Sequence, residues 1–320
     1  MRNYRIFVYA PLPKEDDIAA RIGWEGVFPA VTTQFRDDYS LDLDATRRVI
    51  EALIRDGVAG LIVCGTVGEN CSLARNEKIA VIEAACDVAK GRVPVIAGVA
   101  EYTMAFAADF TREAQRAGVD GLMVLPAMVY SAKPAETLAH FRGVARATSL
   151  PIMIYNNPPI YKTDVTPAML AELADCDTIV CFKESSGDTR RFVDLRALTG
   201  DRFVPFCGLD DAIVESVLMG AVGWVSGLSN VFPHEGERLF HLARAGRVAE
   251  AMPLYQWFMP LLHLDARPDL VQCIKLCESI AGRGSSVTRP PRLPLEGAEK
   301  AEVERLMRAA LATRPMLAAA

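Results

Sequence analysis

Residues 93–126 read VPVIAGVAEYTMAFAADFTREAQRAGVDGLMVLP, and this stretch decides the fold. A short apolar run at 93–99 is followed by apolar side chains at helical spacing over 103–117, and then by a second apolar run at 121–126. Apolar runs without polar alternation are typical of strands that are buried on both faces of a parallel sheet. Gly118 stands where the helix should end, because glycine adopts the left-handed backbone conformation of helix ends without strain. The stretch therefore predicts one strand–helix–strand unit.

The same unit recurs along the whole chain. Short apolar runs bounded by Gly or Pro occupy residues 26–33, 60–65, 93–99, 121–126, 151–156, 179–185, 202–208 and 223–228. Segments of helical period lie at 43–56, 76–90, 103–117, 137–148, 167–174, 191–199, 211–219 and 234–245. Eight strands that alternate with eight helices favour a TIM (β/α)₈ barrel. A doubly wound nucleotide-binding sheet is the competing architecture, but no predicted strand is followed by G-x-G-x-x-G or by a G-x-x-x-x-G-K-[ST] phosphate loop.

Three parts are expected along the chain. An N-terminal extension covers residues 1–23, the barrel covers 24–246, and a C-terminal helical layer covers 247–320. Within the layer, helical segments at 249–264, 270–281 and 298–311 are interrupted by the proline-rich stretch 287–294. The length of 320 residues fits a barrel of about 250 residues plus additions.

Composition excludes several function classes. The net charge is -5 and the basic residues form no stripe, so a nucleic-acid partner is not expected. No apolar run approaches the roughly 20 residues that span a bilayer, and we expect a cytoplasmic protein without a membrane partner. None of the eight cysteines forms a C-x-x-C pair, and the four histidines show no H-E-x-x-H spacing. Buried free thiols, no metal and no cofactor are therefore expected.

Lys183 is the first candidate for chemistry. It lies near the end of the run 179–185, on the same strand face as Cys181 and Ser185. If this face points into the barrel, loss of hydration lowers the pKa of the amine, and the neutral amine attacks carbonyls and imines near neutral pH. The alternative is a lysine at the end of a strand that extends into solvent, and this segment alone does not decide between the two.

Two further strand ends carry polar groups. The sequence G-T-V-G-E at 65–69 follows the second predicted strand, and its glycines let backbone N–H groups converge on an anion such as a carboxylate. The alternative is an ordinary tight turn. Tyr155 ends the run 151–156, where its phenol can donate and accept protons. The alternative is a tyrosine that only caps the core.

Position along the strands favours a shared site. Several candidates fall at the carboxyl ends of different predicted strands, namely Thr66, Tyr155, Lys183, Gly208 and Ser226 with Gly227. This is the face on which barrel enzymes build their sites, so these side chains should lie around one pocket.

Three motifs also carry a family resemblance. They are Gly65-Thr66-Val67-Gly68-Glu69, Tyr155-Asn156-Asn157-Pro158 and Lys183-Glu184-Ser185-Ser186-Gly187-Asp188. In this order they resemble the dihydrodipicolinate synthase and N-acetylneuraminate lyase superfamily, from about Trp24 to Leu295. The resemblance implies that Lys183 forms a Schiff base, that Tyr155 shuttles protons, and that Thr66 with the Val67 amide cradles a carboxylate. It also implies a homo-oligomer, a tetramer or a dimer.

Further residues are expected to bind the substrate. These candidates are Gly65, Tyr130, Gly208 and Ser226. The synthases carry a second tyrosine after the fourth strand, and here either Met128 or Tyr130 takes that place, depending on a one-residue insertion.

Within the superfamily the chain is most similar to the 1-pyrroline-4-hydroxy-2-carboxylate deaminases. This similarity lies in residues 26–35, 65–73, 125–130 and 289–295. Two departures from the synthases support it: Ile160 stands where the synthases have an arginine for their aldehyde substrate, and Val67 replaces a second threonine. The resemblance predicts deamination and dehydration of this cyclic imine to 2,5-dioxopentanoate and ammonia.

Two other functions stay open. One is an aldolase or dehydratase acting on 2-keto-3-deoxy sugar acids through the same lysine. The other is a barrel without catalytic activity that binds a 2-oxo acid as a regulator. Retention of both Lys183 and Tyr155 argues against the regulator, because a binding module does not need a desolvated nucleophile.

Overall fold

The computed structural model describes residues 22–127 and 130–316. Residues 1–21 of the predicted extension at 1–23 therefore lie outside the described residues. Met128 lies outside them as well. Strands β1 to β8 within the described part are, in order, Gly26–Pro29, Leu61–Val63, Val95–Val99, Gly121–Val124, Ile152–Asn156, Ile179–Glu184, Val204–Cys207 and Gly223–Ser226. All pair in parallel, in the order β1-β8-β7-β6-β5-β4-β3-β2.

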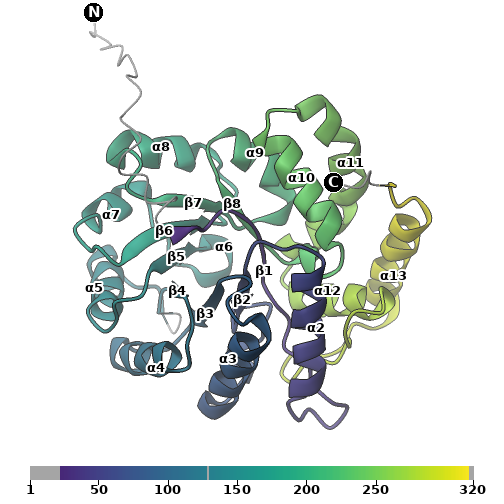
Figure 1. The fold of residues 1–320 in the computed structure, drawn as a ribbon, viewed down its shortest axis with the longest axis horizontal. Coiled ribbons are helices and arrows are strands. Elements are labelled where there is room, and N and C mark those ends of the chain that lie inside the picture. Colours follow the sequence, from purple (N-terminus) through teal and green to yellow (C-terminus); the bar gives the residue numbers. More distant parts are fainter. Residues whose placement is uncertain (1–21, 128–129, 317–320) are drawn as a thin grey trace, which may run out of the picture.

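The sheet closes into a barrel between β1 and β2. Ala30, just after β1, forms a parallel bridge with Ile62 of β2, and the Val31 N–H donates to the Ile62 carbonyl at 2.8 Å. Figure 1 shows the strands gathered at the centre with helices around them. The predicted (β/α)₈ barrel is confirmed, because all eight strands appear within the predicted runs. Each is one to four residues shorter than its run, since ladder pairing ends before the apolar stretch does.

Helices follow the strands as the sequence period predicts. The helices around the barrel are α2 (Leu43–Arg55), α3 (Arg75–Ala89), α4 (Met104–Arg116), α5 (Pro134–Ala145), α6 (Pro158–Tyr161), α7 (Pro167–Glu172), α8 (Arg190–Thr199), α9 (Ile213–Leu218) and α10 (Pro233–Arg244). Short 3₁₀ turns are η2 (Asn70–Ser72), η3 (Asp210–Ala212), η4 (Leu228–Asn230) and η5 (His263–Ala266). The sequence did not predict α6 or these turns, because they are too short to show a period.

Aromatic side chains fill the barrel interior below the carboxyl ends of the strands. Phe28 and Phe206 are fully buried and meet edge to face, with 5.3 Å between ring centroids. Two glycines make space for these rings. A Cβ on Gly60 would lie 2.1 Å from the Phe28 ring, and a Cβ on Gly223 would lie 2.2 Å from the Phe206 ring. These rings therefore fill the barrel interior with side chains, as is usual for this fold.

A C-terminal layer packs beside the barrel. It consists of α11 (Val248–Leu262), α12 (Leu270–Ile280) and α13 (Gly297–Ala312), which Figure 1 shows along one side of the barrel next to α10. Phe258 of α11 and Met307 of α13 are fully buried in the same apolar cluster as Phe28. Every helix in the described residues is too short or too polar to span a lipid bilayer.

The cysteines are free thiols in the structure. Cys64, Cys181, Cys207, Cys273 and Cys277 are buried, as predicted for core thiols. The prediction was wrong for Cys71, which is exposed because it lies on the short turn η2.

Candidate active site

A cavity opens at the carboxyl ends of the strands. The space in it that is open to a water-sized sphere is small, about 30 Å³, so the cavity is narrow. The described residues that line it are Ala30, Gly65, Thr66, Val67, Met123, Tyr155, Asn157, Ile160, Lys183, Gly208, Leu209, Val225, Gly227, Asp265 and Leu270. They come from most of the strand ends and from the C-terminal layer. Seven of the residues expected at the site from the sequence therefore lie together: Gly65, Thr66, Val67, Tyr155, Lys183, Gly208 and Gly227.

Lys183 stands on the inner face of β6. Its residue is 5% exposed, and Tyr155 is its neighbour in the ladder between β5 and β6. The ammonium nitrogen lies 3.6 Å from the centroid of the Tyr155 ring. Gly208 makes room for the lysine chain, because a Cβ there would lie 2.5 Å from Lys183 Cε and 2.2 Å from Ser185 Oγ. The amine is thus held in the cavity and shielded from bulk water.

The loop at 65–69 is held from behind by a buried ion pair. Glu69 has a φ of 56°, and Lys275 of α12 donates to its carboxylate at 2.8 Å; both side chains are fully buried. Lys275 also donates to the Thr33 carbonyl at 2.8 Å, and Glu69 accepts from the Arg289 N–H at 3.0 Å. The Glu69 N–H also donates to the Thr66 carbonyl at 3.0 Å, so the loop is a tight turn that leads into η2, as the alternative expected. Its backbone is anchored to the C-terminal layer.

Tyrosines of β5 and α6 form a polar chain across the cavity wall. The Tyr161 and Thr66 hydroxyl groups share a hydrogen bond, and the Tyr161 ring meets the Tyr155 ring edge to face at 5.5 Å. Asn157 caps α6, since its side chain accepts from the Ile160 N–H, and it also donates to the Tyr155 hydroxyl at 3.0 Å. Burial, with a contribution from the Tyr155 phenol, raises the pKa of Tyr161. Sequence reasoning missed Tyr161, although it lies only six residues after Tyr155.

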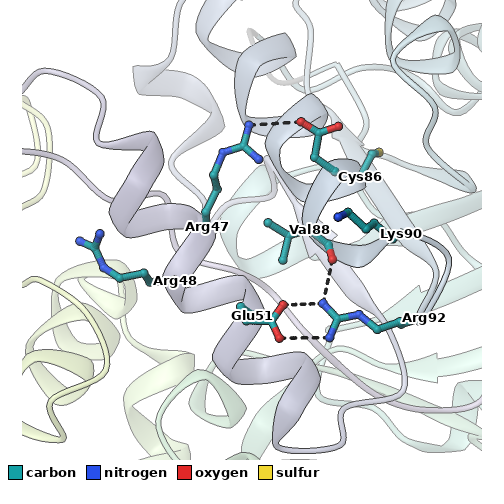
Figure 2. A pocket seen from close by; sticks show the side chains of 8 residues that line it. Arg47, Arg48, Glu51, Cys86, Val88, Lys90 and Arg92 are labelled. Atoms are coloured by element: carbon teal, nitrogen blue, oxygen red, sulfur yellow. Dashed lines mark hydrogen bonds and ion pairs between the residues drawn. The ribbon is translucent and has the colours of Figure 1, made fainter.

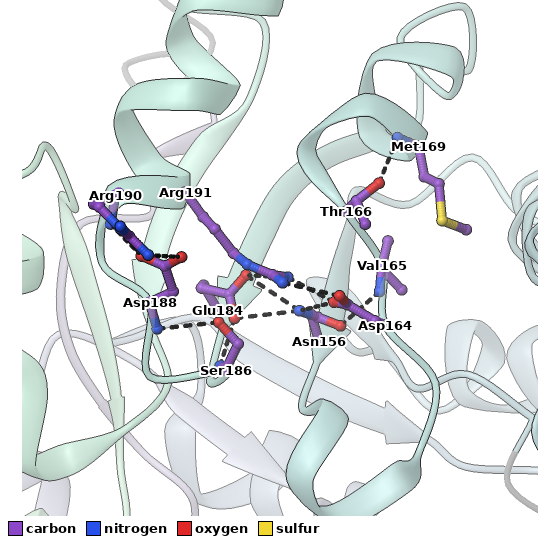
Figure 3. A network of polar contacts seen from close by, with 10 residues as sticks. All are labelled: Asn156, Asp164, Val165, Thr166, Met169, Glu184, Ser186, Asp188, Arg190 and Arg191. Carbon is purple, nitrogen blue, oxygen red and sulfur yellow. Dashed lines mark hydrogen bonds and ion pairs between the residues drawn. The ribbon is translucent and has the colours of Figure 1, made fainter.

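The outward faces of β5 and β6 are tied together by a polar network. Neighbouring residues of a strand point to opposite sides, so Asn156 and Glu184 point out where Tyr155 and Lys183 point in. The Asn156 amide donates to both Glu184 carboxylate oxygens at 3.2 Å, as Figure 3 shows.

Arg191 extends this network into the next helix. It lies 2.6 Å from Asp164 Oδ1 and 3.7 Å from Glu184 Oε2. Asp164 also accepts from the Asn156 amide at 3.3 Å, which closes the ring of contacts in Figure 3. The network fixes the strand ends that carry the two inward-facing groups.

Two acids lie on the side of the cavity that faces the C-terminal layer, the half-buried Asp265 and the fully buried Asp210. Asp265 of η5 lines the cavity, and burial raises its pKa to about 6, although the nearby Lys183 charge lowers it. Asp210 of η3 lies deeper and accepts from Trp224 Nε1 at 2.9 Å, from Ser226 Oγ at 3.2 Å and from the Leu228 N–H at 2.8 Å. No sequence motif pointed to either residue.

Two predicted substrate-binding residues lie elsewhere. Ser226 is fully buried and bonds Asp210, because the side chains of Val225 and Ser226 point to opposite sides of β8 and the Val225 side is the inner one. Tyr130 is 59% exposed and is not among the described lining residues of the cavity. Met128, the alternative to Tyr130, lies outside the described residues.

A second hollow lies on the outer surface between α2 and α3, as Figure 2 shows. Two of its cations have partners: Arg47 lies 3.3 Å from Asp87, and Arg92 pairs with Glu51 and donates to the Val88 carbonyl at 2.8 Å. Arg92 lies three residues before the start of β3, so this hollow lies at the opposite end of the strands from Lys183. This hollow is therefore separate from the cavity around Lys183.

Comparison with known proteins agrees with this arrangement. Residues 24–310 match the model of the dihydrodipicolinate synthetase family. The chain is 33% identical over 287 residues to 4-hydroxy-tetrahydrodipicolinate synthase of Methanothrix thermoacetophila, covering 88% of this chain and 95% of the relative. It is 32% identical over 291 residues to the synthase of Brucella abortus, covering 90% and 98%.

Solved structures show the same likeness. The prophage protein YagE of E. coli K12, solved in complex with pyruvate, has a TM-score of 0.84 and 29% identity over 90% of this chain and 99% of that one. Dihydrodipicolinate synthase DapA-2 of Bacillus anthracis has a TM-score of 0.86 and 26% identity over 91% and 99%. The family model, the relatives and the solved structures agree, and the chain belongs to the dihydrodipicolinate synthetase family.

Proposed function

We propose that Lys183 forms a Schiff base with a 2-oxo acid or its cyclic imine, and that the chain deaminates and dehydrates 1-pyrroline-4-hydroxy-2-carboxylate. The observation that carries the proposal is the placement of Lys183 in a cavity at the strand ends, 5% exposed and against Tyr155. An amine in such a place is suited to covalent catalysis on carbonyl and imine carbons.

The cavity favours a substrate with one carboxylate. We propose that the Thr66 hydroxyl and the Val67 amide bind this carboxylate next to Lys183. Among the described lining residues Lys183 is the only basic one, and Ile160 lies where the resemblance places an arginine of the synthases. A second anionic group would therefore lack a cationic partner. The pyrroline carries a single carboxylate, and this argues against synthesis of dihydrodipicolinate.

The proposed deamination and dehydration can be written as balanced steps that use Lys183, Tyr155 and water. The Lys183 amine attacks C2 of the imine, the bond from C2 to the ring nitrogen breaks, and a ketimine forms with a free amine on C5. Tyr155 removes a C3 proton, the C4 hydroxyl leaves as water, and the double bond moves so that C5 becomes an imine. Two waters then hydrolyse the C5 imine and the Schiff base. The products are ammonia and 2,5-dioxopentanoate, with one water consumed overall.

The test uses the purified full chain. Incubation with the pyrroline should release ammonia and 2,5-dioxopentanoate in equal amounts, and borohydride with pyruvate should leave a stable adduct on Lys183 that Lys183→Met does not form. Asp188→Asn is the control, because the half-buried Asp188 carboxylate pairs with Arg190 and does not line the cavity. Absence of the adduct from the native chain refutes the Schiff base.

A second candidate is an aldolase or dehydratase on 2-keto-3-deoxy sugar acids. The same cavity supports it, because these acids also carry one carboxylate next to a carbonyl carbon. Turnover of such an acid without ammonia, and no ammonia from the pyrroline, would establish this activity instead. Formation of the adduct with turnover of neither substrate would favour a binding protein.

A further inference from the structure

Asp265 enters the cavity from outside the barrel. It lies on η5, which joins α11 to α12 in the C-terminal layer. Its carboxylate occupies the space that Gly227 leaves at the end of β8, since a Cβ on Gly227 would lie 2.6 Å from Asp265 Oδ1. The missing side chain of Gly227 therefore gives this carboxyl group access to the same cavity as Lys183 and Tyr155.

The charged groups around Asp265 differ in their hydrogen-bond partners and in whether they line the cavity. Asp210, on η3, is held by Trp224 and by the start of η4 and does not line the cavity. Asp211, also on η3, accepts from His263 Nδ1 at 2.8 Å. Lys183 faces Asp265 from β6. Among the described residues that line the cavity, Asp265 is thus the one with an acidic side chain.

We propose that Asp265 is a catalytic acid that protonates the C4 hydroxyl of the substrate as this group leaves. The inference rests on the proposed function. The proton passes from the Asp265 carboxyl to the C4 oxygen, the bond from C4 to oxygen breaks, and its electron pair departs with water. The enamine electrons form the double bond between C3 and C4, and the Lys183 nitrogen regains its positive charge. The Asp265 carboxylate recovers a proton from the water that later attacks C5.

The electrostatic setting suits this role. Burial raises the pKa of Asp265 to about 6, so a fraction of the molecules keeps the proton near neutral pH. A group with a pKa close to the working pH is an effective general acid. Because the protonated form is the active one, its contribution is largest well below pH 6, is halved at about 6 and declines further as the pH rises.

The deciding experiment separates dehydration from Schiff-base formation. Asp265→Asn should still form the borohydride adduct with pyruvate and exchange the pyruvate methyl protons in heavy water within threefold of the native rate. Ammonia release from the pyrroline should fall by about 100-fold, a typical loss for one general acid. The decline of kcat above pH about 6 should be present in the native chain and absent from the variant. Asp269→Asn is the matched control, since Asp269 pairs with Arg267 and does not line the cavity.

The outcomes are distinguishable. If the native chain releases no ammonia from the pyrroline, the proposed function fails, and this inference fails with it. If the native chain is active and Asp265→Asn stays within threefold of it, only the role of Asp265 is overturned. Loss of the pyruvate adduct in Asp265→Asn would show that Asp265 positions Lys183 and does not act as the acid.

Discussion

Gly208→Ala is the sharpest test of how Lys183 is held. The backbone of Gly208 is not in the left-handed region, so alanine is opposed only by contacts. The new Cβ would lie 2.5 Å from Lys183 Cε and 2.7 Å from Lys183 Cγ, where ordinary contact begins at 3.4 Å. The lysine chain must therefore move by about 0.9 Å, and a displacement near 1 Å costs roughly 100-fold in rate. This corresponds to about 2.7 kcal/mol of barrier height.

The assay for Gly208→Ala is the rate of borohydride-trapped adduct with pyruvate, followed by the mass of the intact chain. Cys207→Ala is the control, because Cys207 is the preceding residue of β7, is buried on the outer side and does not line the cavity. Thermal unfolding of both variants shows whether the fold is kept. A Gly208→Ala chain that forms the adduct within threefold of the native rate would refute the crowding argument, whatever its stability.

Three further predictions address the cavity wall and its support. Tyr161→Phe removes the hydroxyl bonded to Thr66, so exchange of pyruvate methyl protons, measured by NMR in heavy water, should slow about tenfold while the adduct still forms. Ile160→Arg adds a cation at the cavity, so 2-oxoglutarate should inhibit about tenfold more tightly, as measured by competition with pyruvate. Lys275→Met leaves Glu69 buried without its partner and should lower the free energy of unfolding in urea by about 3–5 kcal/mol, with partial recovery in Lys275→Met/Glu69→Gln.

The sequence predicted those parts of the fold that repeat. Apolar runs marked the strands, and Lys183 and Tyr155 fell at the carboxyl ends of two neighbouring strands, although the runs alone did not decide which face points inward. Position at a strand end was not sufficient for Ser226, because alternate residues of a strand point to opposite sides and its side chain points outward to Asp210.

Tyr161 and Asp265 could not be found by this reasoning. Tyr161 lies on a four-residue helix after two prolines, a stretch too short to show a period. Asp265 is separated from Lys183 by about eighty residues of sequence and reaches it only through packing of the C-terminal layer. Local pattern carries no information on such contacts.

The C-terminal layer is part of the site rather than a covering of the barrel. Lys275 of α12 fixes Glu69 and with it the loop that carries Thr66, while η5 brings Asp265 to Lys183. Burying an ammonium and a carboxylate costs several kcal/mol, and apolar residues of the same size would fill the space at lower cost. The pair is therefore better explained by what it positions than by its contribution to stability. Lys183, Tyr155 and Thr66 stand in the motifs that carry the family resemblance, so they do not distinguish one family substrate from another. We therefore expect substrate specificity to depend on two residues outside these motifs, Tyr161 of α6 and Asp265 of η5.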